Sequence, residues 1–186
     1  MDAEAAKLIG AGLAAIGAGL AAGGVGSTAV QVAKARGARV ITSASSRHEA
    51  YLKQLGADEI HAYDKETIAD VVKDVDVVIN AVGSENQAAM GYVKRGGRVI
   101  NIGGMTDAAA CAARGITCMS GGPQAGGPTV GELIKELVKM ADAGQFTVVI
   151  DKRFPLEQIN EAFAFGRAGN REGKIAIDVT KDAMSK

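Results

Sequence analysis

The chain has 186 residues, of which 21 are basic, 21 are acidic and 47% are hydrophobic. This length suits one domain of ordinary size. The balanced charge gives no reason to expect nucleic acid or an acidic surface as a partner. Aromatic residues are scarce, with no Trp, three Tyr and four Phe, so stacking of bases on aromatic side chains is not expected.

The cysteines and histidines indicate no metal site. Cys111 and Cys118 cannot supply the four ligands of a structural zinc site, and His48 and His61 lie far from them in the sequence. We expect two ordinary thiols in a reducing compartment, and therefore a cytoplasmic protein. The acidic N-terminus lacks the basic region of a secretory signal.

The first predicted element lies in the Ala/Gly-rich stretch 8–37, which carries no charge before Lys34. Residues 8–33 are long enough to span a bilayer as a helix. They contain few Leu, Ile or Val and include Ser27, Thr28 and Gln31, so membrane insertion is only marginally favourable. Residues before the glycines form either the first strand of a sheet or a helix outside it. Ala and Gly make that strand a weak one.

A glycine turn follows, formed by Gly23, Gly24 and Gly26, and the next predicted helix ends at Gly37. The turn resembles a dinucleotide-binding fingerprint in which Ala21 replaces the first glycine. A glycine at 23 lets the backbone approach a pyrophosphate, and the free N–H groups of the helix start bind its charge. We therefore interpret the turn as a phosphate-binding turn.

The end of the second predicted strand, 38–45, concerns the choice of cofactor. An acid about 20 residues after the turn would bind a ribose 2′-hydroxyl. Here Ala44 stands near that position, followed by Ser45, Ser46 and Arg47. With hydroxyls and a guanidinium present and no carboxylate to repel a 2′-phosphate, the sequence favours NADP(H) over NAD(H).

Strand-like and helix-like segments alternate through the rest of the chain. We expect further strands at 58–63, 75–83, 97–105, 115–120, 146–151 and 173–179. We expect helices at 47–57, 65–74, 85–95, 128–145 and 156–169, the helix at 128–145 being the most clearly amphipathic. This alternation predicts an α/β fold with a Rossmann-like, doubly wound parallel sheet.

Several motifs share one family's order and spacing. They are "AAGGVGSTAVQVAKARGARVI", "LGADEIHAYDKE", "VDVVINAVG", "RGGRVINIGG", "ADAGQF" and "REGKIAIDV". They resemble the nucleotide-binding half of the medium-chain dehydrogenase/reductase superfamily, in its zinc-independent, quinone-oxidoreductase-like branch. The resemblance covers residues 21 to 180.

The resemblance implies a set of cofactor contacts. It places the pyrophosphate at Gly23, Gly24, Val25 and Gly26, and the adenosine phosphate near Ser45, Ser46, Arg47 and Tyr63. It places the nicotinamide ribose near Ala81, Val82 and Gly83, and the nicotinamide near Ile102, Gly103 and Gly104. Catalytic residues remain unknown, because no side chain is placed by motif as an acid or a base.

The resemblance also implies a catalytic, GroES-like domain that this chain lacks. The strands predicted in "TVVIDKRFPLEQ" and "GKIAIDV" would join that domain in the family and need other partners here. We divide the chain into an atypical segment 1–20, a dinucleotide-binding domain 21–145 and a strand–helix–strand extension 146–186. The first 21 residues resemble the start of the ATP synthase c subunit.

Three functions remain open at this stage. The first is an NADP(H)-dependent oxidoreductase that transfers hydride to a small quinone, enone or carbonyl substrate. The second is a non-catalytic dinucleotide-binding module. The third, and least favoured, is a membrane-associated fusion related to the c subunit. The family resemblance further implies a homodimer, formed through strands near "GITCMS".

Overall fold

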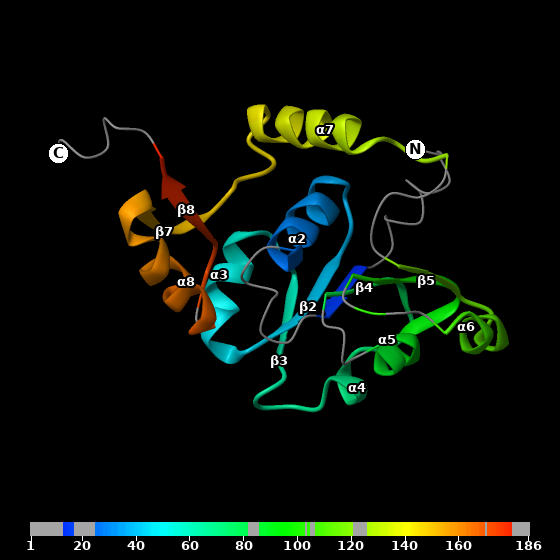
Figure 1. The fold of residues 1–186 in the computed structure, drawn as a ribbon. Helices are drawn as coiled ribbons and strands as arrows, with labels where there is room; N and C mark the ends of the chain where they lie inside the picture. Colours follow the sequence, from blue (N-terminus) through cyan, green and yellow to red (C-terminus); the bar gives the residue numbers. More distant parts are fainter. Residues whose placement is uncertain are drawn as a thin grey trace.

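The main feature of the fold is a six-stranded sheet in which every neighbouring pair of strands is parallel (Figure 1). The computed structural model describes residues 13–16 in their backbone alone, and residues 25–81, 86–102, 104, 107–120, 126–169 and 171–179. The strand order is β3-β2-β1-β4-β5-β6. The strands are β1 (Leu13–Ile16), β2 (Val40–Ala44), β3 (Glu59–Ala62), β4 (Val75–Asn80), β5 (Val93–Asn101) and β6 (Thr117–Ser120).

Strand β1 settles the alternative left open for the first residues. Its backbone pairs with β2 on one side and with β4 on the other, so this segment is the first strand of the sheet. Pairing on both sides stabilises a sequence, LAAI, whose local preference for a strand is weak. The sheet therefore extends into the segment 1–20, before the expected domain boundary at residue 21.

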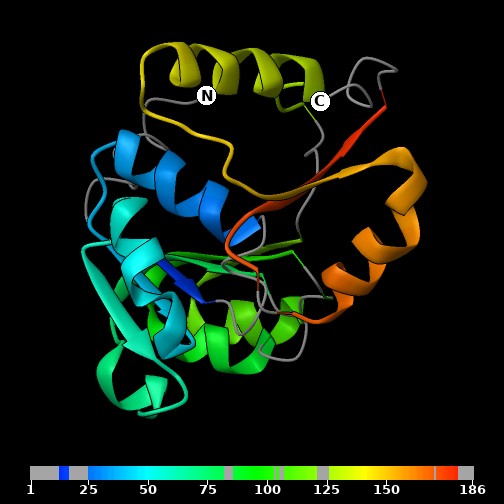
Figure 2. The ribbon, with the colours of Figure 1, turned by 90° about the vertical axis from the view of Figure 1, so that its left-hand side faces the viewer.

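Helices cover both faces of the sheet, as the doubly wound prediction requires. Figure 2 shows α2 and α3 on one side of the strands and α5 and α6 on the other. The helices are α2 (Val25–Ala35), α3 (Glu49–Gln54), α4 (Ile68–Val71), α5 (Asn86–Tyr92), α6 (Ala108–Arg114), α7 (Val130–Asp142) and α8 (Ile159–Arg167). Two short 3₁₀ turns, η1 (Ser46–His48) and η3 (Leu156–Gln158), precede α3 and α8. The Rossmann-like fold class is confirmed.

Each face of the sheet has its own apolar core, because successive residues of a strand point to opposite faces. Val77 of β4 packs with Val30 and Leu52 on the face covered by α2 and α3. Its neighbour Val78 packs with Val99 and other residues on the face covered by α5 and α6. This explains why β4 reads in the sequence as a nearly continuous apolar run.

The C-terminal part forms a small unit beside the main sheet. Strands β7 (Ile150–Pro155) and β8 (Lys174–Asp178) pair in parallel, with α8 between them in the sequence. These strands therefore find partners in each other. Strand β7 begins at Ile150, later than the predicted start at residue 146. Before it, the backbone of Thr147 is bound to the side chain of Gln31 by two hydrogen bonds, of 2.8 Å and 3.1 Å.

The expectation of two ordinary thiols is wrong. Cys111 and Cys118 form a disulfide, with their Cα atoms 6.0 Å apart. Cys111 lies on α6, a helix that the sequence interpretation missed, and Cys118 lies on β6, the next strand. A helix followed at once by a strand that packs beside it brings two cysteines seven positions apart within bonding reach. The argument for a reducing cytoplasm from free thiols is lost with it.

Helix α7 differs from its prediction in burial. The helix begins at a capping box, in which Thr129 and Glu132 satisfy each other's backbone N–H groups. Its apolar stripe does not enter the core: Ile134 is 54% exposed and Val138 is 53% exposed, whereas Met140 is buried. Figure 1 shows α7 lying above α2 at the edge of the molecule, and an ion pair between Arg36 and Glu136 links the two helices.

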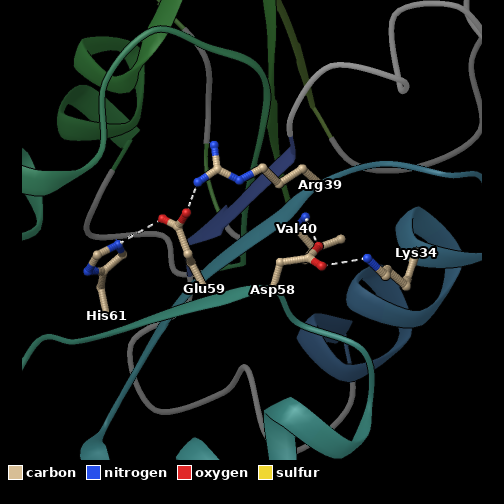
Figure 3. A network of polar contacts seen from close by, with 6 residues as sticks. All are labelled: Lys34, Arg39, Val40, Asp58, Glu59 and His61. Atoms are coloured by element: carbon tan, nitrogen blue, oxygen red, sulfur yellow. Dashed lines mark hydrogen bonds and ion pairs between the residues drawn. The ribbon is translucent and has the colours of Figure 1, made fainter.

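A polar network holds the amino ends of β2 and β3 together (Figure 3). Asp58 accepts hydrogen bonds from the Val40 backbone N–H, at 2.7 Å, and from the Lys34 ammonium, at 2.6 Å. These donors lower the pKa of Asp58, with the Lys34 bond as the largest cause. Glu59 pairs with Arg39 and lies 3.6 Å from His61. The Asp58 bonds lie at the opposite end of β2 from Ala44 and the residues that follow it.

Candidate functional site

Those predicted cofactor residues that the structure describes lie toward one edge of the sheet. In a parallel sheet the carboxyl ends of all strands meet at the same edge, and ligands bind where the strand order reverses. Here that point lies between β1 and β4, and the strand order is that of a dinucleotide-binding fold. Helix α2 begins at Val25, directly after the glycine turn, with Gly26 buried in its first turn. Gly23 and Gly24 lie outside the described residues.

An apolar hollow of about 410 Å³ lies between α2 and the carboxyl halves of β4 and β5. It is lined by Val25, Thr28, Ala29, Val32, Ile79, Ile100, Ile102 and Lys174. Lys174 belongs to β8, so the C-terminal unit adds a cation to this face of the main sheet. The sequence interpretation did not assign Lys174, because no local pattern connects it with a turn about 150 residues earlier. An apolar hollow with a few polar groups is typical of cofactor sites.

At the carboxyl end of β2 the structure brings together the residues assigned to the adenosine phosphate. Ser45, Ser46 and Arg47 follow β2 directly, and the Arg47 Nε donates to Ser45 Oγ at 3.3 Å. The backbone N–H of Tyr63 donates to the Ala44 carbonyl at 3.1 Å, which places the two chain segments side by side. All four assigned residues therefore share this end of the site.

One part of the cofactor argument is wrong. A carboxylate does stand at this position, and it comes from Asp64. Asp64 accepts hydrogen bonds from the Ser46 backbone N–H, at 2.9 Å, and from the Ser46 hydroxyl, at 2.8 Å. The backbone bond, followed by the hydroxyl bond, lowers the pKa of Asp64. The carboxylate thus holds donors that we assigned to a 2′-phosphate. Sequence reasoning missed it because Asp64 follows β3, 18 residues after Ser46.

The residues assigned to the nicotinamide end follow β4 and β5. Ala81 comes directly after β4, and Ile102 directly after β5. The backbone N–H of Ile102 donates to the Asn80 carbonyl at 2.8 Å, so the two strand ends are held together. Gly104 is described, whereas Val82, Gly83 and Gly103 lie outside the described residues.

Each histidine lies beside at least one carboxylate. The Nδ1 of His61 lies 3.0 Å from Glu66, and its Nε2 lies near Glu59. His48 is buried, and its Nδ1 lies 3.3 Å from Glu172. Within the part of the chain that the structure describes, no three His, Cys, Asp or Glu side chains are grouped to hold a metal ion.

The same described residues include no helix with the length and apolar character needed to cross a membrane. Helix α2, which follows the glycine turn, has 11 residues and ends at Ala35. A helix is therefore present where the sequence predicted one before Gly37, while most of the glycine turn lies outside the described residues.

The strand order and the helices on both faces define a Rossmann-type α/β fold. A family model described as zinc-binding dehydrogenase matches residues 55–177. The chain belongs to this family, and the resemblance found in the sequence is confirmed.

Individual relatives are oxidoreductases. The chain is 30% identical over 155 residues to an NADPH-dependent alkenal/one oxidoreductase of Arabidopsis thaliana, covering 81% of this chain and 37% of that protein. It is 32% identical to a 2-methylene-furan-3-one reductase of Solanum lycopersicum, with the same coverage. The structure of a quinone oxidoreductase from Coxiella burnetii matches with a TM-score of 0.79 and 27% identity, covering 95% of this chain and 56% of that one. The chain thus spans about 40 to 60% of the length of these relatives.

Proposed function

We propose that this chain binds NADP(H) and forms the cofactor-binding half of an oxidoreductase that reduces a quinone, an enone or another carbonyl compound. The observation that carries the proposal is the hollow between α2 and the carboxyl halves of β4 and β5, beside the switch point of the sheet. When bound, the cofactor supplies the hydride. The names of the relatives support this choice of reaction.

The chain's own residues would bind and orient the cofactor. The N–H groups at the start of α2 would bind the pyrophosphate, and glycine at positions 23 and 24 would leave room for it. Ser45, Ser46 and Arg47 would hold the 2′-phosphate, and this requires Asp64 to release Ser46. Apolar side chains such as Ile100 and Ile102 would shield the nicotinamide side from water. We propose that the dinucleotide-binding domain, placed at 21–145, also takes in β1.

Arg47 provides a test of the cofactor choice. A guanidinium that contacts the 2′-phosphate favours NADPH and contributes little to NADH binding. Arg47→Ala is therefore expected to weaken NADPH binding about tenfold and to change NADH binding about twofold or less. Titration of the purified chain with both nucleotides measures this. Equal losses for both nucleotides would contradict the assignment of the 2′-phosphate to this end.

A second candidate function is a dinucleotide-binding module without activity of its own. The observation in its favour is that no acid or base has been assigned among the described residues at this edge. NADPH oxidation in the presence of phenanthrenequinone separates the two functions. Turnover supports the oxidoreductase, whereas saturable binding without turnover supports the module. The homodimer implied by the family resemblance stays a prediction, testable by sedimentation.

A further inference from the structure

Three asparagines meet at the carboxyl ends of β4 and β5. Asn80 is the last residue of β4, Asn101 the last of β5 and Asn86 the first of α5. Asn80 is 0% exposed and Asn101 is 2% exposed. A buried polar side chain is costly unless it is hydrogen-bonded. Three carboxamides at the ends of two apolar central strands therefore need hydrogen-bond partners there.

The Asn80 side chain joins the other two. Its Nδ2 donates to the Asn86 Oδ1 at 2.8 Å and to the Asn101 Oδ1 at 3.0 Å. An amide nitrogen carries two hydrogens, so both bonds are satisfied at once. The backbone carbonyl of Asn80 also accepts from the Ile102 N–H, at 2.8 Å. Asn80 therefore fixes the end of β4, the start of α5 and the end of β5 relative to one another.

The Asn86 side chain reaches the next segment of the chain. Its Nδ2 occupies the space that a Cβ at position 104 would need, so Gly104 is required for the close approach of this amide. The network thus extends from β4 to Gly104. Its members stand directly beside Ala81, Ile102 and Gly104, which are the described residues assigned to the nicotinamide and its ribose.

The position of β4 and β5 in the strand order also fits their assignment to the nicotinamide half of the cofactor. The adenosine residues lie at β2 and β3, on one side of the switch point, so a dinucleotide that crosses the crevice places its nicotinamide over β4 and β5. We infer that Asn80 is a positioning residue for the nicotinamide half of the cofactor, acting through its carboxamide bonds to Asn86 and Asn101. This inference rests on the proposed function.

The test compares two ligands on the full chain. NADPH reaches both halves of the site, whereas 2′,5′-ADP lacks the nicotinamide and reaches the adenosine half alone. In Asn80→Asp both donated bonds are lost, because a carboxylate oxygen faces two carbonyl oxygens. We expect Asn80→Asp to weaken NADPH binding about tenfold or more and to change 2′,5′-ADP binding about twofold or less.

A second pair of variants guards against a failure of Asn80→Asp to fold. Asn86 is partly exposed at the start of α5, so changes there disturb folding less. Asn86→Ala removes one acceptor of the Asn80 amide. It is expected to weaken NADPH binding by about threefold to tenfold and to leave 2′,5′-ADP binding nearly unchanged. Asn86→Asp keeps an acceptor oxygen for Asn80, and a negative charge suits a helix start. Asn86→Asp is therefore expected to bind NADPH nearly as tightly as the unmodified chain does.

Each outcome decides the matter. Selective loss of NADPH binding in Asn86→Ala, with recovery in Asn86→Asp, supports the inference. NADPH affinity unchanged in Asn86→Ala, or NADPH and 2′,5′-ADP weakened equally, overturns it, since a general structural role affects both ligands. If the unmodified chain binds neither ligand, the proposed function itself is refuted and the inference with it.

Discussion

Removing the disulfide between α6 and β6 should lower the stability of the fold by a predictable amount. The bond joins Cys111 and Cys118 across seven positions of sequence. Closing a loop of this length removes chain entropy from the unfolded state worth about 2.4 kcal/mol at 25 °C. This is a large share of the roughly 5–15 kcal/mol that stabilises a typical domain. Cys118→Ala, at the less buried of the two positions, is therefore expected to lower the free energy of unfolding by about 2 kcal/mol.

Urea denaturation followed by circular dichroism measures the change, with and without dithiothreitol. Reduction should destabilise the unmodified chain by about the same amount and leave Cys118→Ala unaffected. This comparison separates the bond from the packing of the side chain, because the reduced protein keeps both sulfur atoms. If the urea midpoint of the unmodified chain does not move on reduction, the two cysteines do not form a stabilising bond and the reasoning fails.

Two further predictions concern carboxylates. Because folding lowers the pKa of Asp58, its carboxylate stabilises the fold above the unfolded pKa of about 4, and this stabilisation is lost as the pH falls through the lower folded value. Urea midpoints measured at about pH 5 and below should therefore fall more steeply with falling pH for the unmodified chain than for Asp58→Asn. Equal slopes for the two proteins would count against the Lys34 and Val40 bonds. At the other end of β2, Asp64→Asn should tighten NADPH binding several-fold and leave NADH binding nearly unchanged, since the carboxylate no longer holds Ser46. A titration in which Asp64→Asn binds NADPH more weakly would show that Asp64 helps the cofactor to bind.

The parts of the fold that follow from local pattern could be predicted from the sequence. The apolar run of β4 indicated a central strand because both of its faces are buried, and the amphipathic spacing of 128–145 indicated the helix α7. Strand β1 could only be left as an alternative, since its pairing with β2 and β4 decides its state. Helix α6 was missed, although Asp107 as its N-cap and Gly115, at a φ of 65°, as its C-cap were visible signals.

Some residues of the candidate site could likewise be assigned from the sequence, and others could not. Residues that directly follow a strand, such as Ser45 and Ile102, could be assigned because the carboxyl ends of parallel strands share an edge. Asp64 and Lys174 could not be assigned, because they reach the site from segments distant in the sequence. The exposed stripe of α7 was also beyond sequence reasoning. Amphipathic spacing shows that a helix has an apolar face, and only the tertiary structure shows whether that face is covered.

The most direct test of the account is equilibrium titration of the purified chain with NADPH, followed by the fluorescence of the nucleotide. Gly23→Asp serves as the control, because a carboxylate in the glycine turn repels the pyrophosphate and fills the space it needs. The account predicts saturable binding at one site per chain, competed by 2′,5′-ADP and abolished in Gly23→Asp. Absence of binding, or binding that Gly23→Asp leaves intact, would contradict the assignment of this edge of the sheet as a dinucleotide site.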